Sequence, residues 1–130
     1  MKRVIIIHGW DGSHNEPMHK WLRNELEKKG FKVEVPTMPN SSKPEINAWV
    51  LHIKGMVDAV NKETYFIGHS IGCQAILRYL ETIDQHKTIG GCILIAPWMS
   101  LDENTLREEG VEVEKIAKPW METPINWKKV

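Results

Sequence analysis

The sequence predicts an α/β protein with three layers, in which helices cover both faces of an open parallel sheet. Two observations favour this class. Short β-branched runs alternate with amphipathic stretches along the chain, without repeats or low-complexity tracts. Each strand is therefore followed by a crossover connection, and right-handed crossovers give the strand order 2-1-3-4. A strand, a tight turn and a helix also follow one another directly at residues 64–72.

The first two strands flank an amphipathic helix. The β-branched run from Arg3 to Ile7 is typical of a strand buried on both faces. The helix begins near Pro17, a favoured first position, and ends at Gly30, a natural C-cap. Residues 31–35 then alternate between apolar and charged side chains, which predicts a half-exposed edge strand.

Helices and strands continue to alternate in the second half of the chain. Ser42 and Glu45 have capping-box spacing ahead of a second amphipathic helix. The third strand is predicted at residues 65–67, an elbow helix from 71 to about 82, and the fourth strand at 91–96.

A serine lies at the tip of the strand-to-helix turn. Residues 64–72 read Thr-Tyr-Phe-Ile-Gly-His-Ser-Ile-Gly and contain the pattern Gly-x-Ser-x-Gly. In a nucleophile elbow, such a strained turn raises the serine hydroxyl above the carboxyl end of a parallel sheet. Gly68 and Gly72 flank the turn, where a Cβ would strike the neighbouring strand or helix. The sequence therefore predicts Ser70 as a catalytic nucleophile, with Gly68, Gly72 and the packing residue His69 supporting the elbow.

The loop after the first strand reads His8-Gly9-Trp10-Asp11-Gly12 and ends at the same edge of the sheet. The backbone N–H groups of Trp10 and Ile71 are candidates for an oxyanion hole. We expect His8 to hold this loop through hydrogen bonds, with Gly9 supporting it. The alternative is an ordinary strand-to-helix turn in which Gly9 and Gly12 supply positive φ.

Several short motifs together resemble a family of small α/β-hydrolase-like serine hydrolases related to the retinoblastoma-binding serine hydrolase. The motifs are His8-Gly9-Trp10, Trp21-Leu22, Met38-Pro39, Trp49, Gly68-His69-Ser70-Ile71-Gly72 and Ala96-Pro97-Trp98. The likeness extends from the first strand to Trp127 but covers only part of the family's domain. It implies two more strands, followed by the acid and the histidine of a catalytic triad. We therefore expect residues 1–130 to form a single α/β-hydrolase-like domain that is C-terminally truncated or has lost its triad.

No triad acid or histidine can be identified within the chain. In this fold the triad follows the order Ser, Asp or Glu, then His. His86 is the only histidine after Ser70, and a helix of about 18 Å would carry it to the opposite end of the sheet. Solvent-facing positions are expected for His14, His19 and His52. Ordinary loop roles are expected for Asp11, Asp102 and Glu103.

Residues 97–130 show no clear period and hold three of the six tryptophans, Trp98, Trp120 and Trp127. This irregular segment begins at the carboxyl end of the fourth strand, on the side of the sheet where doubly wound folds bind ligands. It is expected either to form an apolar wall or lid near Ser70, or to pack over the sheet edge. The strand at 91–96 is apolar and free of charge, so if it is left bare the chain is expected to self-associate along it.

Composition excludes several classes of partner. The 17 basic and 17 acidic side chains cancel, which favours neither nucleic acid nor an anionic membrane. No apolar stretch has the length of a signal peptide or of a membrane span, so a cytoplasmic location is expected. Cys73 and Cys92 are expected to be buried packing residues without a disulfide. The histidines lack metal-ligand spacing, and no metal or cofactor is predicted.

These patterns predict a serine hydrolase that cleaves a small ester or amide through an acyl-enzyme on Ser70. The alternative is a non-catalytic module that binds a protein or a small ligand through the pocket or the tryptophan-rich segment. A Rossmann-type nucleotide binder is disfavoured, because the loop after the first strand lacks the pattern G-x-G-x-x-G.

Overall fold

The computed structural model describes all 130 residues and contains one parallel sheet of four strands in the order β2-β1-β3-β4. The strands are β1 (Arg3–Ile7), β2 (Lys32–Glu34), β3 (Thr64–His69) and β4 (Gly91–Ile95). The predicted fold class and strand order are therefore confirmed. Strand β2 is shorter than expected and keeps only the middle of the alternating segment.

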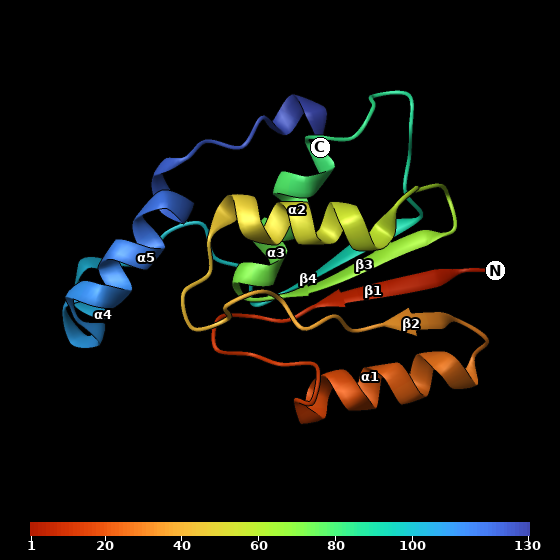
Figure 1. Ribbon diagram of the computed structural model, residues 1–130, viewed down its shortest axis with the longest axis horizontal. Helices are drawn as coiled ribbons and strands as arrows, with labels where there is room; N and C mark the ends of the chain where they lie inside the picture. The colour runs from red at the N-terminus through yellow and green to blue at the C-terminus, as the bar shows by residue number, and fades with distance from the viewer.

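Three helices sandwich the sheet. Helix α1 (Pro17–Lys28) covers one face, and α2 (Ile46–Val57) and α3 (Ile71–Leu80) cover the other (Figure 1). Helix α2 does not use the expected capping box, because its N-cap is Glu45, which makes no side-chain capping bond. The physical reason is Pro44, which keeps Lys43 out of the helical region and delays the start of the helix.

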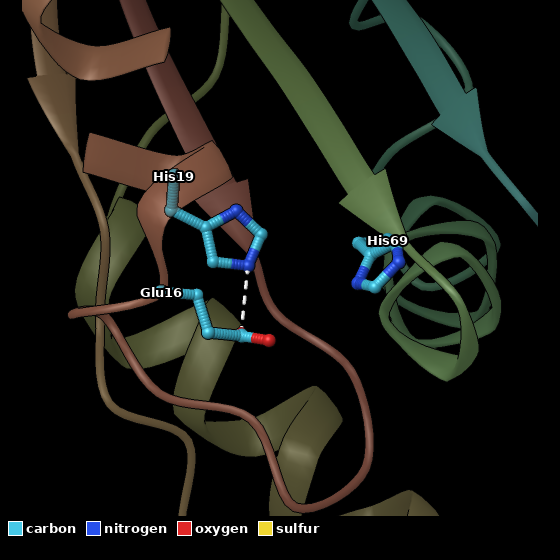
Figure 2. Close-up of side chains that lie close together, drawn as sticks. All are labelled: Glu16, His19 and His69. Carbon is cyan, nitrogen blue, oxygen red and sulfur yellow. Dashed lines mark ion pairs between the residues drawn. The ribbon is translucent and has the colours of Figure 1, made fainter. Parts of the chain in front are cut away.

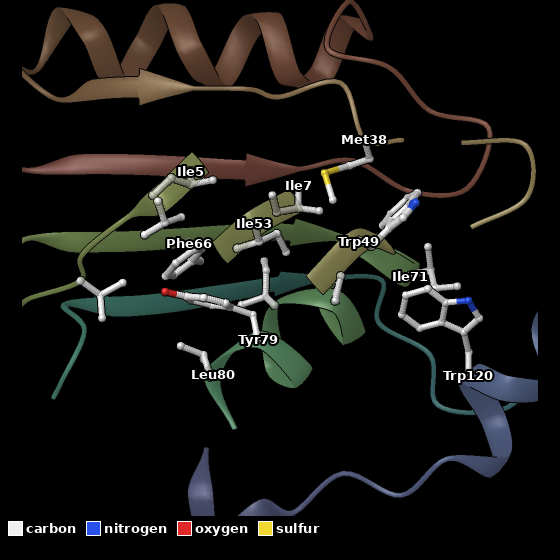
Figure 3. Packing of buried hydrophobic residues seen from close by; sticks show 14 residues of the cluster. Ile5, Ile7, Met38, Trp49, Ile53, Phe66, Ile71, Tyr79, Leu80 and Trp120 are labelled. Atoms are coloured by element: carbon white, nitrogen blue, oxygen red, sulfur yellow. The ribbon is translucent and has the colours of Figure 1, made fainter. Parts of the chain in front are cut away.

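Each face of the sheet has its own apolar core. Along β1, Ile5 and Ile7 belong to the larger cluster under α2 and α3, whereas Val4 and Ile6 belong to the smaller cluster under α1. In the larger cluster, Trp49 of α2 lies among side chains from the sheet and from α3 (Figure 3). Burying each large apolar side chain stabilises the fold by roughly 1.5 to 3 kcal/mol. These two cores fix the position of the strand ends that carry the site.

The expectation of an irregular segment at 97–130 was wrong. The segment contains α4 (Glu103–Glu109), α5 (Val111–Glu122) and a final 3-10 turn, η1 (Trp127–Lys129). Both helices lie beyond the carboxyl ends of the strands (Figure 1). The Asp102 side chain caps α4 by accepting the Thr105 N–H at 2.7 Å. Pro119 lies inside α5, and α4 is only seven residues long, which explains why no helical period was visible in the sequence.

The segment also leaves β4 uncovered, which excludes the expected packing over the sheet edge. Ile93 is 59% exposed and Trp127 is 58% exposed, so this tryptophan does not shield the strand. Cys92 is exposed as well, contrary to the expectation of a buried thiol, because the strand has no neighbour on that side. Cys73 is buried, and both cysteines are free. No helix combines the length and the apolar character that crossing a membrane requires.

Candidate active site at the nucleophile elbow

Ser70 occupies the turn between β3 and α3 in a strained conformation. Its backbone has φ 55° and ψ −124°, in the positive-φ region that a residue with a side chain rarely adopts. The flanking glycines are needed for space. A Cβ on Gly68 would lie 2.8 Å from the Cα of Cys73, and a Cβ on Gly72 would overlap the Ile7 carbonyl oxygen. The serine therefore sits at the N-terminus of α3, against the end of β1.

The hydroxyl of Ser70 accepts a hydrogen bond from a tryptophan. The indole Nε1–H of Trp98 lies 3.1 Å from Ser70 Oγ, and no histidine hydrogen bonds to that oxygen. The chain reaches this position through Ala96, which has φ 49° and turns the backbone directly after β4. The Ser70 N–H also donates to the Ile95 carbonyl at 2.9 Å. The sequence pointed to Trp98 only as part of a wall or lid, and the hydrogen bond to Ser70 was not predicted.

A buried polar chain holds the Trp98 segment in place. Gln74 donates from Nε2 to the Trp98 carbonyl at 2.9 Å, and its Oε1 accepts from Arg78 Nε at 3.1 Å and Nη2 at 3.0 Å. Arg78 Nη2 also donates to the carbonyls of Trp120 at 3.1 Å and Thr123 at 2.7 Å. We call Gln74 and Arg78 the latch. It connects α3 to the C-terminal end of α5.

Arg78 is buried without a carboxylate partner. Only 3% of the residue is exposed, and burial lowers the pKa of its guanidinium. The carbonyl groups that accept its hydrogen bonds belong to the last turn and the C-cap of α5, the negative end of that helix dipole. The guanidinium also stacks over the Trp120 ring, 5.9 Å from its centroid. These contacts replace the water that the cation has lost.

The loop after β1 lies against the elbow. A Cβ on Gly9 would be 3.0 Å from the Cβ of Ser70, so the loop backbone reaches the serine only because residue 9 has no side chain. The alternative in which Gly9 and Gly12 supply positive φ was wrong, because the residue with positive φ is Asp11, at 57°. Trp10 follows Gly9 in this loop, and Ile71 is the first residue of α3. Both candidate oxyanion donors are thus one residue away from the contact between loop and elbow.

His8 joins the loop to the segment before α2. Its Nε2 accepts the Met38 N–H at 3.0 Å, so the ring proton is on Nδ1, which donates to the Gly9 carbonyl at 2.8 Å. The ring is fully buried and meets Trp49 edge-on. Burial lowers the pKa of His8, and the neighbouring His14 lowers it further, while Gly9 and Glu16 raise it. The imidazole is therefore held neutral.

The remaining histidines divide into two groups. His14 and His52 are exposed, as expected, and His86 is exposed as well. His19 is fully buried, contrary to the expectation of a solvent-facing residue, because the first turn of α1 packs this side chain against the sheet. It lies near Glu16 and His69 (Figure 2). The sequence analysis did not predict this grouping, because His69 is far from Glu16 and His19 along the chain.

None of the candidate acids forms a hydrogen bond with Ser70 Oγ. Asp102 caps the N-terminus of α4, and the hydrogen bond that it accepts from Thr105 lowers the pKa of its carboxyl group. Glu103 lies 3.4 Å from Arg107 in a surface ion pair. Asp11 is exposed. None of these carboxylates forms a hydrogen bond with a histidine, so no Ser-His-acid relay is assembled at the turn that carries Ser70.

Comparisons with known proteins agree with this architecture. The sequence model of the family described as serine hydrolase matches residues 4–124. "Putative hydrolase YdeN" of Bacillus subtilis (strain 168) is 35% identical over 95 residues, which cover 73% of this chain and 50% of that protein. "Serine hydrolase RBBP9" of Rattus norvegicus is 26% identical over 127 residues, which cover 97% of this chain and 57% of that protein. The chain thus spans about half the length of these curated relatives.

Two solved structures show the same fold. The crystal structure of the ydeN gene product of B. subtilis superposes with a TM-score of 0.83 at 26% identity, over 99% of this chain and 64% of that one. A protein of Thermoplasma acidophilum described as a predicted CIB-like hydrolase gives a TM-score of 0.61 at 18% identity, over 88% and 57% of the two chains. The resemblance inferred from the short motifs is confirmed by the family match. The chain belongs to the serine hydrolase family.

Proposed function

We propose that Ser70 is the nucleophile of a hydrolase that cleaves a small ester or amide. The observation that supports this proposal is the backbone conformation of Ser70, which has φ 55°. The turn is flanked by Gly68 and Gly72, two positions at which a side chain would clash with neighbouring atoms. Such strain costs about 1 to 3 kcal/mol, and residues in sparsely populated conformations cluster at active sites. A packing role for the serine would not require this conformation. The glycines at 68 and 72 and the strand-to-helix position match the nucleophile elbow of serine hydrolases.

In this proposal Ser70 Oγ attacks the carbonyl carbon, and the Oγ–C bond forms as the carbonyl oxygen becomes an anion. The N–H groups of Trp10 and Ile71 donate hydrogen bonds to that oxygen, and the positive end of the α3 dipole stabilises its charge. The bond to the leaving group then breaks, and the leaving group takes up the proton that the Ser70 hydroxyl has lost. Water then hydrolyses the acyl-enzyme and restores the Ser70 hydroxyl. Each oxyanion donor is expected to contribute about 3 kcal/mol to transition-state stabilisation.

The proton of the Ser70 hydroxyl has no histidine to receive it among these 130 residues. An unactivated serine is a weak nucleophile, and an oxyanion hole with binding alone supplies roughly a 10³-fold acceleration over water. Trp98 acts on the same atom. Its indole N–H holds Ser70 Oγ in one rotamer and stabilises negative charge as it develops on that oxygen. We therefore expect this chain to react slowly, with the base coming from water or from another segment.

A non-catalytic role in binding a protein or a small ligand is the second candidate. The observation that favours it is that Ser70 Oγ bonds to an indole N–H instead of a base. In this case the elbow would be a retained scaffold, and the strained serine would have no chemical task. The two candidates differ in one measurable property, the reactivity of Ser70 toward an electrophile that mimics the acyl transition state.

A fluorophosphonate probe tests the proposal. We expect weak, time-dependent labelling of the 130-residue chain on the peptide that contains Ser70, with no labelling of Ser70→Ala. Ser100→Ala, which changes an exposed serine near the same edge of the sheet, should label like the unmodified chain. Labelling that persists in Ser70→Ala would refute the proposal. No labelling after long incubation would favour the binding role, and strong labelling would point to a histidine base that His8→Ala or His14→Ala would identify.

A further inference from the structure

Three metal-ligand side chains meet beside the elbow, although they come from two distant parts of the sequence. Glu16 is the N-cap of α1, His19 lies in its first turn, and His69 ends β3, one residue before Ser70. Figure 2 shows Glu16 and His19 paired on one side of a short gap and His69 on the other. One ligand atom from each of the three residues lies within 4.8 Å of the other two.

The buried nitrogen atoms in this cluster lack hydrogen-bond partners. His19 is fully buried, and neither of its ring nitrogens is satisfied; Nδ1 of His69 is also buried and unsatisfied. Glu16 Oε2 approaches His19 Nε2 to 3.0 Å, but off the direction that a hydrogen bond from the ring requires. Buried polar atoms without a hydrogen-bond partner are costly and therefore rare in native structures. Several of them in one place suggest a shared ligand.

The off-axis approach of the carboxylate fits coordination of a shared ion. A metal lies on the lone-pair axis of an imidazole nitrogen, and its other ligands lie beside that axis. At zinc bond lengths of about 2.0 to 2.1 Å, tetrahedral ligands are separated by roughly 3.3 Å. The 3.0 Å between His19 Nε2 and Glu16 Oε2 is close to that spacing, and a ligand atom of His69 lies within 4.8 Å of the ligand atoms of both residues.

The loop after β1 lies close against the cluster. A Cβ on Gly12 would lie 2.7 Å from Glu16 Oε2, so only glycine at this position leaves the carboxylate where it is. The Ser13 N–H donates to Glu16 Oε2 at 3.2 Å and so orients the carboxylate, as outer hydrogen bonds do at metal sites. The Glu16 side chain is 37% exposed, which gives a hydrated ion a way in.

We propose that Glu16, His19 and His69 bind one divalent transition-metal ion next to Ser70. Two imidazoles and a carboxylate form the three-residue set that zinc accepts while keeping a fourth position open. The ion ties the first turn of α1 to the end of β3, and so fixes the loop that lies against the elbow. This inference does not depend on Ser70 being a nucleophile, because the ion is held by other residues.

Calorimetric titration with Zn²⁺ tests the site on the full chain, after treatment with a chelator. A Cys92→Ser background removes the exposed thiol as a competing ligand. We expect one ion per chain. Loss of an outer hydrogen-bond partner already costs roughly 10- to 100-fold in metal affinity, so loss of a ligand in Glu16→Gln or His69→Gln should cost about 100-fold or more. Glu16→Gln keeps the size of the side chain and the oxygen that accepts the Ser13 N–H. His14→Gln, an exposed histidine of the same loop, is the matched control and should bind normally.

Long-range ¹H–¹⁵N spectra of the imidazole rings identify the ligands directly. Zn²⁺ is expected to shift the ring nitrogen resonances of His19 and His69, and to leave those of His14, His52 and His86 unchanged. No saturable binding at millimolar Zn²⁺ would overturn the proposal, and would leave ordered water as the partner of the buried nitrogens. Normal affinity in both Glu16→Gln and His69→Gln, or shifts confined to exposed histidines, would overturn it as well.

Discussion

At the scale of single residues, space and protonation decide the geometry of the site. Ser70 keeps a strained backbone because Gly68 and Gly72 let two strands and a helix approach it closely. His8 works through its protonation state. Its neutral ring donates to the Gly9 carbonyl and accepts from the Met38 N–H, and both bonds require the proton to stay on Nδ1 alone. A second proton on Nε2 would face a donor.

The stability of the chain is therefore expected to fall at mildly acidic pH. Burial lowers the pKa values of His8 and His19 below their ordinary value of 6.5. Between the folded and unfolded pKa values the unfolded chain binds more protons, so the free energy of unfolding decreases as the pH falls below 6.5. Urea unfolding between about pH 7.5 and about pH 5.5, where ordinary carboxylates stay ionised, measures this decrease. A chelator in the buffer keeps metal out of the comparison.

Substitution separates the buried histidines from the exposed ones. His8→Gln should lower stability at every pH but flatten its dependence on pH, because one titrating group is gone. His86→Gln changes an exposed histidine and should leave the slope unaltered. A native chain whose stability is constant across this range would contradict the prediction, as would a slope that survives the loss of both His8 and His19.

At the scale of secondary structure, α3 organises the site from both of its ends. Ser70 is the N-cap of this helix, and its second and third turns carry the latch residues Gln74 and Arg78. Through the latch, the helix that begins directly after Ser70 also holds the loop that places Trp98 on Ser70 Oγ. The connection to the end of α5 means that the C-terminal helices and the elbow form one polar network.

Removal of Arg78 should release α5. Arg78→Met keeps the length and the apolar stem but leaves the carbonyls of Trp120 and Thr123 without their donor. We expect a loss of roughly 3 kcal/mol in the free energy of unfolding, and faster hydrogen exchange in α5. Arg107→Met is the matched control. Arg107 is in an exposed pair on α4, and its loss should cost less than about 1 kcal/mol. Equal effects of the two substitutions would show that the latch does not hold the helix.

At the scale of the whole molecule, the two edges of the sheet differ. Strand β2 is short and carries Lys32 and Glu34, whose charged groups lie 3.5 Å apart and discourage pairing with another chain. Strand β4 has no charged residue and exposes Ile93 and Leu94. Its outer backbone groups have no strand partner, because the sheet ends there. This edge is the feature of the molecule most suited to association.

The chain is therefore expected to self-associate along β4. Sedimentation velocity should show a concentration-dependent increase in mass, because strand pairing satisfies the outer N–H and C=O groups and buries apolar surface. Ile93→Lys places a charge at the centre of the edge and should restore the monomer. Val111→Lys is the matched control, since Val111 is 66% exposed but lies on α5. A chain that is monomeric at all concentrations, or one that both substitutions affect equally, would contradict the prediction.

The sequence predictions were correct for features that depend on neighbouring residues, and failed for features that depend on contacts between distant parts of the chain. The alternation of strands and helices and the glycine spacing around Ser70 depend on neighbouring residues, so they were recognised. The order of the sheet followed from the general preference for right-handed crossovers. Helix α4 was missed because it is only seven residues long, and α5 because it depends on distant contacts such as the packing of Trp120 against Trp49. Cys92 was assigned to the interior on its apolar neighbours alone, although no element covers β4.

By itself the sequence determined the α/β fold and the place of Ser70 in it, because backbone propensity and steric demands act over a few residues. Only the tertiary structure decided what surrounds that serine. Trp98 is 28 residues from Ser70 along the chain, and His19 is 50 residues from His69, yet the indole meets the hydroxyl and the two imidazoles lie together. These contacts arise where parallel strands end side by side and helices pack across them. Their geometry depends on the packing of the whole sheet, which no local pattern of residues encodes.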